Sequence, residues 1–392
     1  MAQRILLFTG KGGVGKTTCA AATAVHAAEA GLRTLILSSD PAHSLADALD
    51  RRLGPEPEEV LPNLFAQEVD LYYSMQKYWG NMRELLRAVF RWQGVGDVAA
   101  EELAALPGMN EGSVLLWLDQ AHHDAAYDLI VVDSAPTGET LTLLTLPQVT
   151  QWWVAKALPF QQAAVKTVGY AVRKTTGVPL DKGYDELNRL FEQLQRIQAV
   201  LADPAISSVR LVANPEKMVI EEARRAYTYL QLYGYNVDAV VVNRVLPEEG
   251  MGTALAKYVA AQRHYLDEIE ATFAPLPILH VPHLGEEVFG AELLRRIGAA
   301  LYDGRDPAAV LHREPTYRIE PDGEGAFEVQ IRLPLADEAE VTAEQFGDQL
   351  VVRVQNQRRN YLLPRFLAYY TLDAARLADG WLRARFTEDG AP

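Results

Sequence analysis

Short apolar runs recur along the first three quarters of the chain, separated by longer stretches with helical patterning. A strand buried on both faces reads as a nearly continuous apolar run, so these runs predict strands. The expected strands are residues 4–9, 32–39, 127–133, 209–214, 237–243 and 277–281. They alternate with predicted helices such as 17–30 and 216–232. This alternation predicts an α/β fold with a mostly parallel sheet and right-handed crossovers.

Two long segments interrupt the alternation of strands and helices. Residues 71–120 have helical patterning that is broken near 93–96 and 107–108, and residues 142–201 form the second segment. Both are expected to be helical insertions that project from the α/β core.

The pattern changes near Asp303. Residues 303–315 read as a linker that closes the first domain, 1–302. From Tyr317 onward apolar and polar residues alternate, which is typical of half-buried strands. The clearest runs are 327–333, 350–354 and 381–386. Residues 316–387 are therefore predicted to form a small all-β sandwich.

A glycine-rich loop follows the first predicted strand and precedes the first predicted helix. It matches the phosphate-binding pattern G-x-x-x-x-G-K-[ST] at Gly10, Gly15, Lys16 and Thr17. Backbone N–H groups of such a loop surround a polyphosphate, with the lysine on the β- and γ-phosphates and the threonine hydroxyl on Mg²⁺. The predicted ATP-binding residues of this loop are Gly10, Lys11, Gly12, Gly13, Val14, Gly15, Lys16, Thr17 and Thr18.

Two aspartates follow strands that should end beside this loop. Asp40 comes after the second strand and is expected to orient the attacking water and to contact Mg²⁺ through water. The alternative is that Asp40 only caps the next helix. Asp133 ends the third strand and is expected to hold the water shell of Mg²⁺, which keeps several waters. The turn at 136–138 is expected to change conformation when the γ-phosphate leaves.

The second loop position carries an additional lysine, Lys11. This placement resembles the deviant-Walker dimeric ATPases, in which the lysine reaches across a dimer interface to the partner's nucleotide. The alternative is a solvated loop lysine.

Three motifs together resemble the ArsA family, which includes the arsenite-pump ATPase and the tail-anchored-protein targeting ATPase. They are Gly10–Thr18, the run Asp40-Pro41-Ala42-His43-Ser44, and Asp133–Leu141. The resemblance covers about residues 1–302. It implies a P-loop NTPase fold and a homodimer that encloses two nucleotides, with Lys11, Lys16 and Asp40 as catalytic residues.

The same resemblance suggests two contacts to adenine. Asn243 ends a predicted strand, and an asparagine amide can pair with the edge of the base; the alternative is an asparagine that caps a turn. Residues 281–290 resemble, more weakly, the last loop that flanks the nucleotide, which places Pro282 in the binding set.

Composition limits the chemistry. There is one cysteine, Cys19, so neither a metalloid site of several thiolates nor a Cys-x-x-Cys zinc site is expected. The 37 basic against 52 acidic residues give a net charge of −15, which argues against nucleic-acid binding. No signal peptide and no long apolar span are seen, so a cytoplasmic location is expected.

One stretch is basic although the chain as a whole is acidic. Residues 140–180 contain no aspartate or glutamate but carry four basic and several aromatic side chains, including Trp152 and Trp153. Two readings are a groove for a hydrophobic helix of a protein client and a contact with an anionic membrane surface. The alternative is packing within the protein or its dimer partner.

The C-terminal region resembles an α-crystallin (small heat-shock protein) domain. The resemblance rests on residues 327–334, residues 362–364 and the run Ala375-x-x-x-Asp379-Gly380-Trp381-Leu382. This resemblance implies chaperone-like binding or regulation of the ATPase; a docking module is the alternative.

Taken together, the sequence predicts an Mg²⁺-dependent ATPase that acts as a nucleotide-switched homodimer and controls binding of a hydrophobic client or a membrane. The rivals are a motor for arsenite efflux, which the single cysteine disfavours, and a binding module whose nucleotide site is regulatory.

Overall fold

A computed structural model describes residues 3–40, 44–78, 109–146, 180–247, 252–323 and 325–388. The chain forms two compact units. Unit 1 comprises Met1–Ile5, Ala20–Leu201 and Phe289–Arg295, and unit 2 comprises Leu6–Cys19, Ala202–Val288 and Arg296–Pro392. Residues 41–43 and the basic, aromatic part of the second insertion, 147–179, lie outside the described residues.

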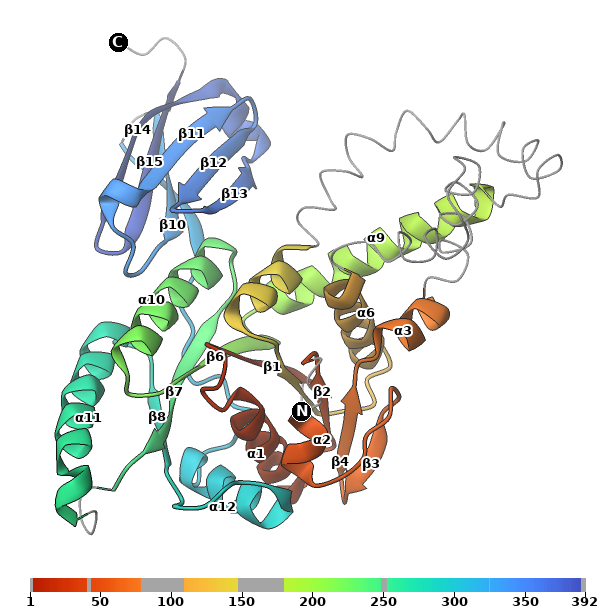
Figure 1. The fold of residues 1–392 in the computed structure, drawn as a ribbon. Helices are drawn as coiled ribbons and strands as arrows, with labels where there is room; N and C mark the ends of the chain where they lie inside the picture. The colour runs from red at the N-terminus through yellow and green to blue at the C-terminus, as the bar shows by residue number, and fades with distance from the viewer. Residues whose placement is uncertain are drawn as a thin grey trace, which may run out of the picture. The chain divides into compact units, whose positions relative to one another are not determined.

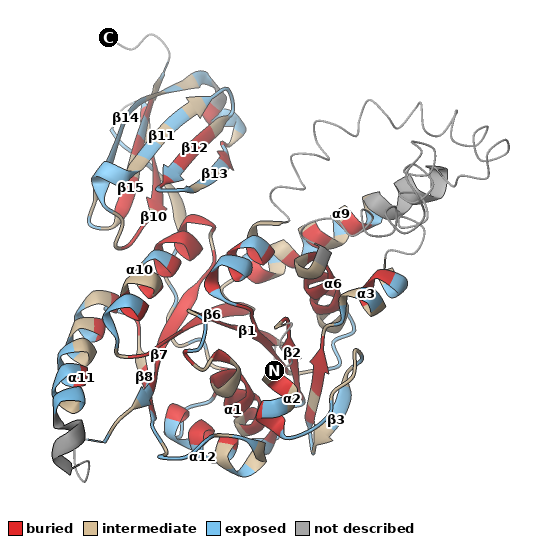
Figure 2. Cartoon of the chain, in the orientation of Figure 1, coloured by how far each residue is buried: buried red, intermediate tan, exposed pale blue. Residues whose placement is uncertain are grey.

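An eight-stranded, mostly parallel sheet forms the core of the α/β region (Figure 1). Its order is β3 (Glu58–Leu61), β4 (Leu64–Glu68), β2 (Thr34–Ser38), β5 (Leu129–Asp133), β1 (Arg4–Thr9), β6 (Ser207–Ala213), β7 (Val237–Val245) and β8 (Ile278–Pro282). Strand β2 runs parallel to β4 and β5, and β7 runs parallel to β6 and β8. The predicted α/β fold is confirmed, and the central strands β1, β2, β5 and β6 are buried along their length (Figure 2).

The helices follow the strands as expected. They are α1 (Lys16–Glu29), α2 (Ser44–Leu49), α3 (Leu71–Tyr78), α6 (Met109–His123), α9 (Leu180–Ala202), α10 (Lys217–Leu232), α11 (Gly252–Phe273) and α12 (Gly290–Tyr302), and residues 137–146 are also helical. Among the helices that the structure describes, none is both long and apolar enough to cross a membrane.

Strands β3 and β4 were not predicted from the sequence. The end of β4 is buried yet polar, with Gln67 and Glu68 almost fully covered. Gln67 Nε2 donates to Pro55 O (2.7 Å), and Glu68 Oε1 accepts from Ala46 N (3.0 Å). Hydrogen bonds therefore compensate the burial of these side chains. A search for apolar runs cannot detect such a strand.

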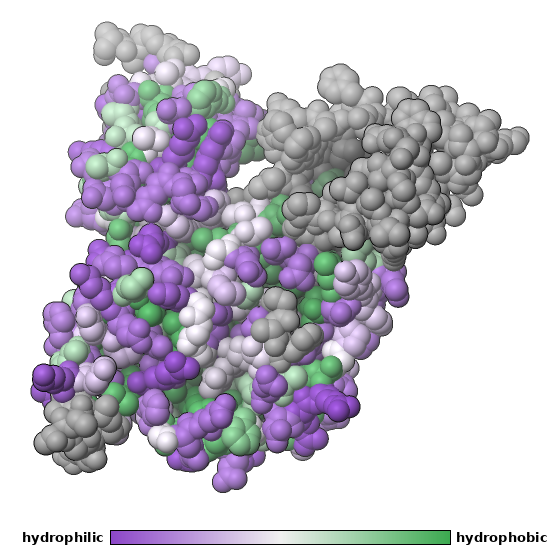
Figure 3. Space-filling model, viewed as in Figure 1, coloured by the Kyte–Doolittle hydropathy of each residue, from purple (hydrophilic) through white to green (hydrophobic). Residues whose placement is uncertain are grey.

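The C-terminal region is an all-β sandwich, as predicted. One sheet has the order β14 (Tyr370–Ala378), β15 (Trp381–Glu388), β10 (Ala326–Arg332) and β9 (Tyr317–Pro321). The other has the order β11 (Val341–Phe346), β12 (Gln349–Val354) and β13 (Gln357–Leu362). Every strand pair is antiparallel. The visible surface of the sandwich is mostly hydrophilic (Figure 3).

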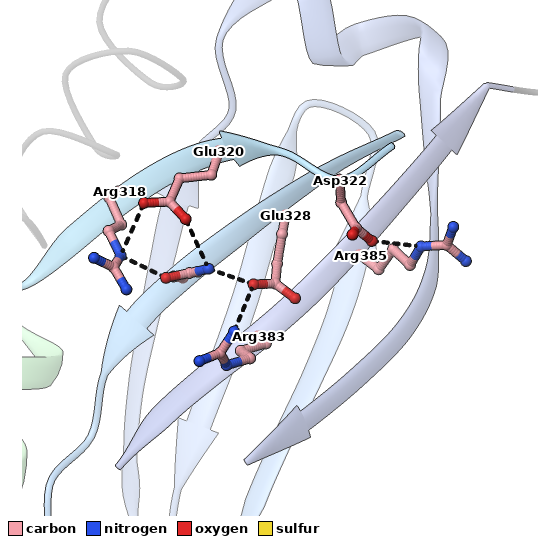
Figure 4. A network of polar contacts seen from close by, with 7 residues as sticks. Arg318, Glu320, Asp322, Glu328, Arg383 and Arg385 are labelled. Carbon is pink, nitrogen blue, oxygen red and sulfur yellow. Dashed lines mark hydrogen bonds and ion pairs between the residues drawn. The ribbon is translucent and has the colours of Figure 1, made fainter. Parts of the chain in front are cut away.

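The outer face of the four-stranded sheet carries a network of ion pairs (Figure 4). Its pairs are Arg318–Glu320 (3.5 Å), Arg383–Glu328 (3.3 Å) and Arg385–Asp322 (2.8 Å). Gln330 lies among them and is only 2% exposed. Because the charged side chains are partly solvated, each pair adds little to stability, but together they keep this sheet face polar.

The segment predicted as a linker, 303–315, is held along the sheet of unit 2. Arg210 on β6 donates to Ala309 O (3.2 Å), and Asn236 Nδ2 donates to His312 O (3.0 Å). Leu311 N donates to Asp238 Oδ2 (3.3 Å). The segment is irregular in backbone but fixed by hydrogen bonds to two strands and the turn before β7.

Helix α10 ends against the β-sandwich. Its last residue is Leu232, and the Leu232 carbonyl accepts hydrogen bonds from Arg359 Nη1 (2.7 Å) and from the Tyr361 hydroxyl. The Tyr233 hydroxyl donates to Gln357 Oε1 (2.8 Å). The final carbonyls of a helix lack the N–H partners of its interior. The backbone after α10 bonds the carbonyls of Tyr229, Leu230 and Gln231, and the sandwich supplies the partners of the last one, Leu232.

We expect Tyr361→Phe to lower the free energy of unfolding by about 1 kcal/mol, because it removes one buried hydrogen bond to the Leu232 carbonyl. Burial raises the pKa of Tyr361, so its hydroxyl stays protonated and remains a donor. Urea unfolding of the full chain measures the effect. Tyr370→Phe is the matched control, since the Tyr370 hydroxyl bonds the exposed Glu388. Equal midpoints for the two variants would show that the cap contributes nothing.

Candidate functional site

The glycine-rich loop lies in unit 2 between β1 and α1. Gly10, Gly13 and Gly15 have φ of +152°, +82° and +94°. A Cβ on Gly10 would lie 2.2 Å from Val212 O, and one on Gly15 would lie 2.1 Å from Asn243 Nδ2. A Cβ on Gly13 would meet nothing within 4 Å. Two of the glycines thus allow close packing on β6 and β7, and the third faces open space.

The loop has the features of an anion cradle. Helix α1 begins at Lys16, so the N–H groups of its first turn have no acceptor within the helix and point toward the loop. Lys16 is 8% exposed, and its Nζ donates to Lys11 O (3.3 Å). Gly12 and Gly13 are exposed, while Lys11, Thr17 and Thr18 are partly exposed. These residues fit a polyphosphate.

Two asparagines, one within β7 and one directly after β6, hold the Val14 carbonyl. Asn243 Nδ2 donates to Val14 O (2.8 Å). Asn214 follows β6, and the amide orientation that satisfies its neighbours donates to the same oxygen (3.2 Å). Asn214 received no role from the sequence. Its position at the carboxyl end of a strand beside the loop was the available signal.

Pro282 ends β8 and is exposed. It pairs in register with Val245 on β7, and His283 N donates to Val245 O (2.8 Å). Pro282 therefore sits at the carboxyl end of the strand next to the one that carries Asn243.

The two predicted aspartates lie in unit 1 and are connected by one serine. Ser38 and Asp133 are register partners on β2 and β5. Ser38 Oγ donates to Asp133 Oδ2 (3.1 Å) and accepts from Asp40 N (3.2 Å). Asp40 Oδ2 also accepts from the hydroxyl of Ser44, the first residue of α2 (2.9 Å). The structure thus brings Asp40 and Asp133 together through Ser38, which sequence reasoning missed.

The turn after Asp133 is fixed by two hydroxyl groups. Ser39 Oγ donates to Asp133 O (3.4 Å) and accepts from Ala135 N (3.1 Å). Thr140 Oγ1 donates to Ala135 O (2.8 Å). A few hydrogen bonds therefore define the conformation of this predicted switch.

The donors named for a metal suit Mg²⁺ by type. Thr17 offers a hydroxyl oxygen in unit 2, and Asp40 and Asp133 offer carboxylate oxygens in unit 1. Hard oxygen ligands of this kind, with water completing the shell, are what Mg²⁺ takes in nucleotide sites.

A glycine-rich loop between a buried strand and a helix, in a mostly parallel sheet with a strand that ends in aspartate, defines a P-loop nucleotide hydrolase. A sequence model of the anion-transporting ATPase (ArsA) family matches residues 3–303. The chain belongs to this family, and it is an ATP-hydrolysing enzyme. A second model, of the HSP20-like domain found in ArsA, matches residues 324–386.

Relatives align over nearly the whole chain. A protein of Chlorobaculum tepidum named "Putative arsenical pump-driving ATPase" is 38% identical over 98% of this chain and 96% of its own length. One of Aquifex aeolicus named "Putative arsenical pump-driving ATPase 1" is 36% identical over 93% of this chain and 95% of its own length. The resemblance seen in the three motifs and in the C-terminal region is confirmed.

Proposed function

We propose that this ATPase requires Mg²⁺ and works as a homodimer that closes around ATP. In this proposal nucleotide state controls a surface that binds a hydrophobic protein client or a membrane. The observation that carries it is the glycine-rich loop with its additional lysine, Lys11, together with two aspartates joined by Ser38. The conformation of Asp40 and the end of β5 can then change together with the nucleotide.

Each residue has a role in the proposed reaction. Lys16 neutralises the β- and γ-phosphates, and Thr17 and Asp133 hold Mg²⁺, the latter through water. Asp40 orients the attacking water and touches the shell of the metal. Lys11 extends from the loop to the nucleotide of the partner subunit.

Arsenite is not included as cargo. The names of the relatives suggest a pump motor, and such a motor gathers metalloid on several soft ligands. The single cysteine of this chain, Cys19, is fully buried within α1. One enclosed thiol offers no such site.

The proposal is tested with Asp40→Asn. We expect this variant to bind ATP with wild-type affinity and to hydrolyse it at least about 100-fold more slowly, because the amide cannot accept a proton from water. Steady-state phosphate release and an ATP titration measure the two quantities. Asp47→Asn is the control, since Asp47 is an exposed carboxylate on the adjacent helix α2. Normal turnover in Asp40→Asn would remove Asp40 from the reaction.

The same slow variant tests the dimer. With Mg²⁺ and ATP, Asp40→Asn is expected to double its mass in light scattering. Adding Lys11→Ala to it should abolish the change, because the lysine no longer bridges to the second nucleotide. A mass that is independent of ATP in Asp40→Asn would contradict the nucleotide-switched homodimer.

A further inference from the structure

Three neighbouring strands of unit 1 carry buried polar side chains at their carboxyl ends. Ser38 on β2 pairs in register with Glu68 on β4 and with Asp133 on β5. Glu68 is 6% exposed, Ser38 1% and Asp133 0%. Ser38 and Asp133 belong to the site described above, whereas Glu68 has no role in it so far. A glutamate is rarely buried to this extent, because removing a charge from water is costly unless hydrogen bonds compensate it.

The Glu68 carboxylate contacts the first turn of α2. Its Oε1 accepts from Ala46 N (3.0 Å), and Ala46 is the third residue of that helix. The N–H groups of a first turn have no acceptor within their own helix, so Glu68 supplies one from a strand. Helix α2 has only six residues, and a helix this short depends on tertiary contacts to hold its position. Glu68 provides one of these contacts.

The first residue of the same helix holds Asp40. The Ser44 hydroxyl donates to Asp40 Oδ2 (2.9 Å). The backbone of Asp40 is held separately, because Asp40 N donates to Ser38 Oγ (3.2 Å). Ser44 thus directs the carboxylate of Asp40, and the place of Ser44 depends on where the first turn of α2 lies. A chain of contacts therefore connects Glu68 to Asp40 through that turn.

Strand β4 gives Glu68 a fixed position. Glu68 N donates to Gly54 O (3.2 Å), and the next residue, Val69, donates through its N–H to Ser38 O (3.1 Å). The backbone on both sides of the Glu68 side chain is therefore bonded to neighbouring segments. A side chain that supports a reacting group has to stand on a rigid element, and the end of β4 meets this requirement.

We infer that Glu68 is a positioning residue for ATP hydrolysis: it holds the first turn of α2, keeps the Ser44 hydroxyl on Asp40 and so aims the Asp40 carboxylate at the attacking water. This inference rests on the proposed function, in which Asp40 orients that water. Glu68 acts through other residues and takes no part in proton transfer. Because a displacement of about 1 Å at a reacting group costs about 100-fold in rate, such a support can control turnover.

The test is Glu68→Ala in the full chain, with ATP binding and steady-state hydrolysis measured separately. We expect kcat to fall by about 10- to 100-fold, because the first turn of α2 loses an acceptor and Asp40 loses its direction. ATP affinity should stay within about 3-fold of the wild type, because an interaction that matters only in the transition state affects kcat and not binding. A kcat equal to that of the wild type would overturn the inference.

Two variants on the same strand make the test specific. Glu68→Gln keeps an oxygen that can accept from Ala46 N, so kcat should recover to within about 3-fold of the wild type. Gln67→Ala is the matched control, because Gln67 is also buried but its Nε2 donates to Pro55 O. It should lower the melting temperature and leave kcat unchanged. Equal losses of kcat in Gln67→Ala and Glu68→Ala, or no recovery in Glu68→Gln, would overturn the inference.

Ser44→Ala tests the second step of the route and leaves the buried carboxylate in place, so it decides the matter even where Glu68→Ala does not fold. We expect a loss of kcat similar to that of Glu68→Ala, and unchanged kcat would contradict the route. The double variant Ser44→Ala, Glu68→Ala should be no slower than the slower single variant, because both changes break the same chain of contacts. Losses that multiply in the double variant would show two independent effects and overturn the inference.

Asp40→Asn separates this inference from the proposed function. In that background Glu68→Ala should cause no further loss of kcat, because the residue that Glu68 positions is already disabled. Slow hydrolysis by Asp40→Asn together with a further loss from Glu68→Ala would overturn the inference alone. Normal hydrolysis by Asp40→Asn would instead overturn the proposed role of Asp40, and the inference with it.

Discussion

Gly10→Ala is expected to abolish ATP binding and hydrolysis together. At this position φ is +152°, and the added Cβ would lie 2.2 Å from Val212 O. That oxygen belongs to the backbone of buried β6, so it cannot move aside as a flexible side chain can. The loop would have to leave its place on the sheet, and displacements of about 1 Å at such sites cost about 100-fold in rate. We expect at least that loss in steady-state ATP hydrolysis.

Two other glycines serve as controls for Gly10→Ala. Gly13→Ala adds a Cβ that meets nothing within 4 Å, so only the left-handed φ of +82° opposes it, at about 1–2 kcal/mol. Its effect on ATP affinity should be clearly smaller. Gly54→Ala also meets nothing within 4 Å and should leave activity and melting temperature unchanged. If Gly10→Ala behaved like Gly54→Ala, the close packing of the loop on β6 would be irrelevant to ATP binding.

Arg210→Met is expected to lower the free energy of unfolding by about 3–5 kcal/mol, as is usual when one partner of a buried ion pair is removed. The side chains of Arg210 and Asp238 are fully buried, and Arg210 Nε lies 3.2 Å from Asp238 Oδ1. Arg210 also donates to the Tyr302 hydroxyl (2.7 Å) and to Ala309 O. Burial alone would lower the pKa of Arg210, but the Asp238 carboxylate and the Tyr302 hydroxyl outweigh it and raise that pKa. Arg210 therefore carries a positive charge in the folded protein. Replacing it with methionine leaves the buried Asp238 carboxylate without a cation beside it.

The double variant Arg210→Met, Asp238→Leu distinguishes the cost of an unpaired buried charge from the contribution of the ion pair itself. Removing both charges should restore much of the stability lost in the single variant. Arg295→Ala is the surface control, because Arg295 and its partner Glu29 are 49% and 40% exposed, and it should cost less than about 1 kcal/mol. Denaturant unfolding measures all three. A loss below 1 kcal/mol in Arg210→Met would show that the buried pair does not hold the 303–315 segment.

The features that were predictable from the sequence were those with a local signature. Apolar runs located the parallel strands, and period-two alternation located the sandwich. The loop glycines, Asp40 and Asp133 could be named as site candidates because motif and strand end coincide. Strand β4 was missed because its buried polar residues are compensated by partners distant in sequence, such as Pro55 and Ala46.

The residues that support the site could be identified only once the register of the strands was known. Ser38 connects Asp40 and Asp133 only because it lies opposite Asp133 on the neighbouring strand. Asn214 and Asn243 hold one carbonyl because β6 and β7 are neighbours in the sheet. Arg244, with φ of +60°, lies in a β-bulge that arises because β7 has one residue more than β8 between the pairs Val242–His280 and Val245–Pro282. None of these arrangements is visible from spacing along the chain.

The sandwich contributes to the structure of the ATPase region, because it provides hydrogen-bond donors for the last carbonyl of α10. If the chain ended before β9, the Leu232 carbonyl would lose both of its donors from the sandwich, Arg359 and Tyr361. The last turn of α10, which packs on β6 and β7, would then keep only the bonds from the backbone that follows it to the carbonyls before Leu232. The two family-defined parts are separable in sequence, but shortening the protein to its ATPase portion would remove both side-chain partners of the Leu232 carbonyl.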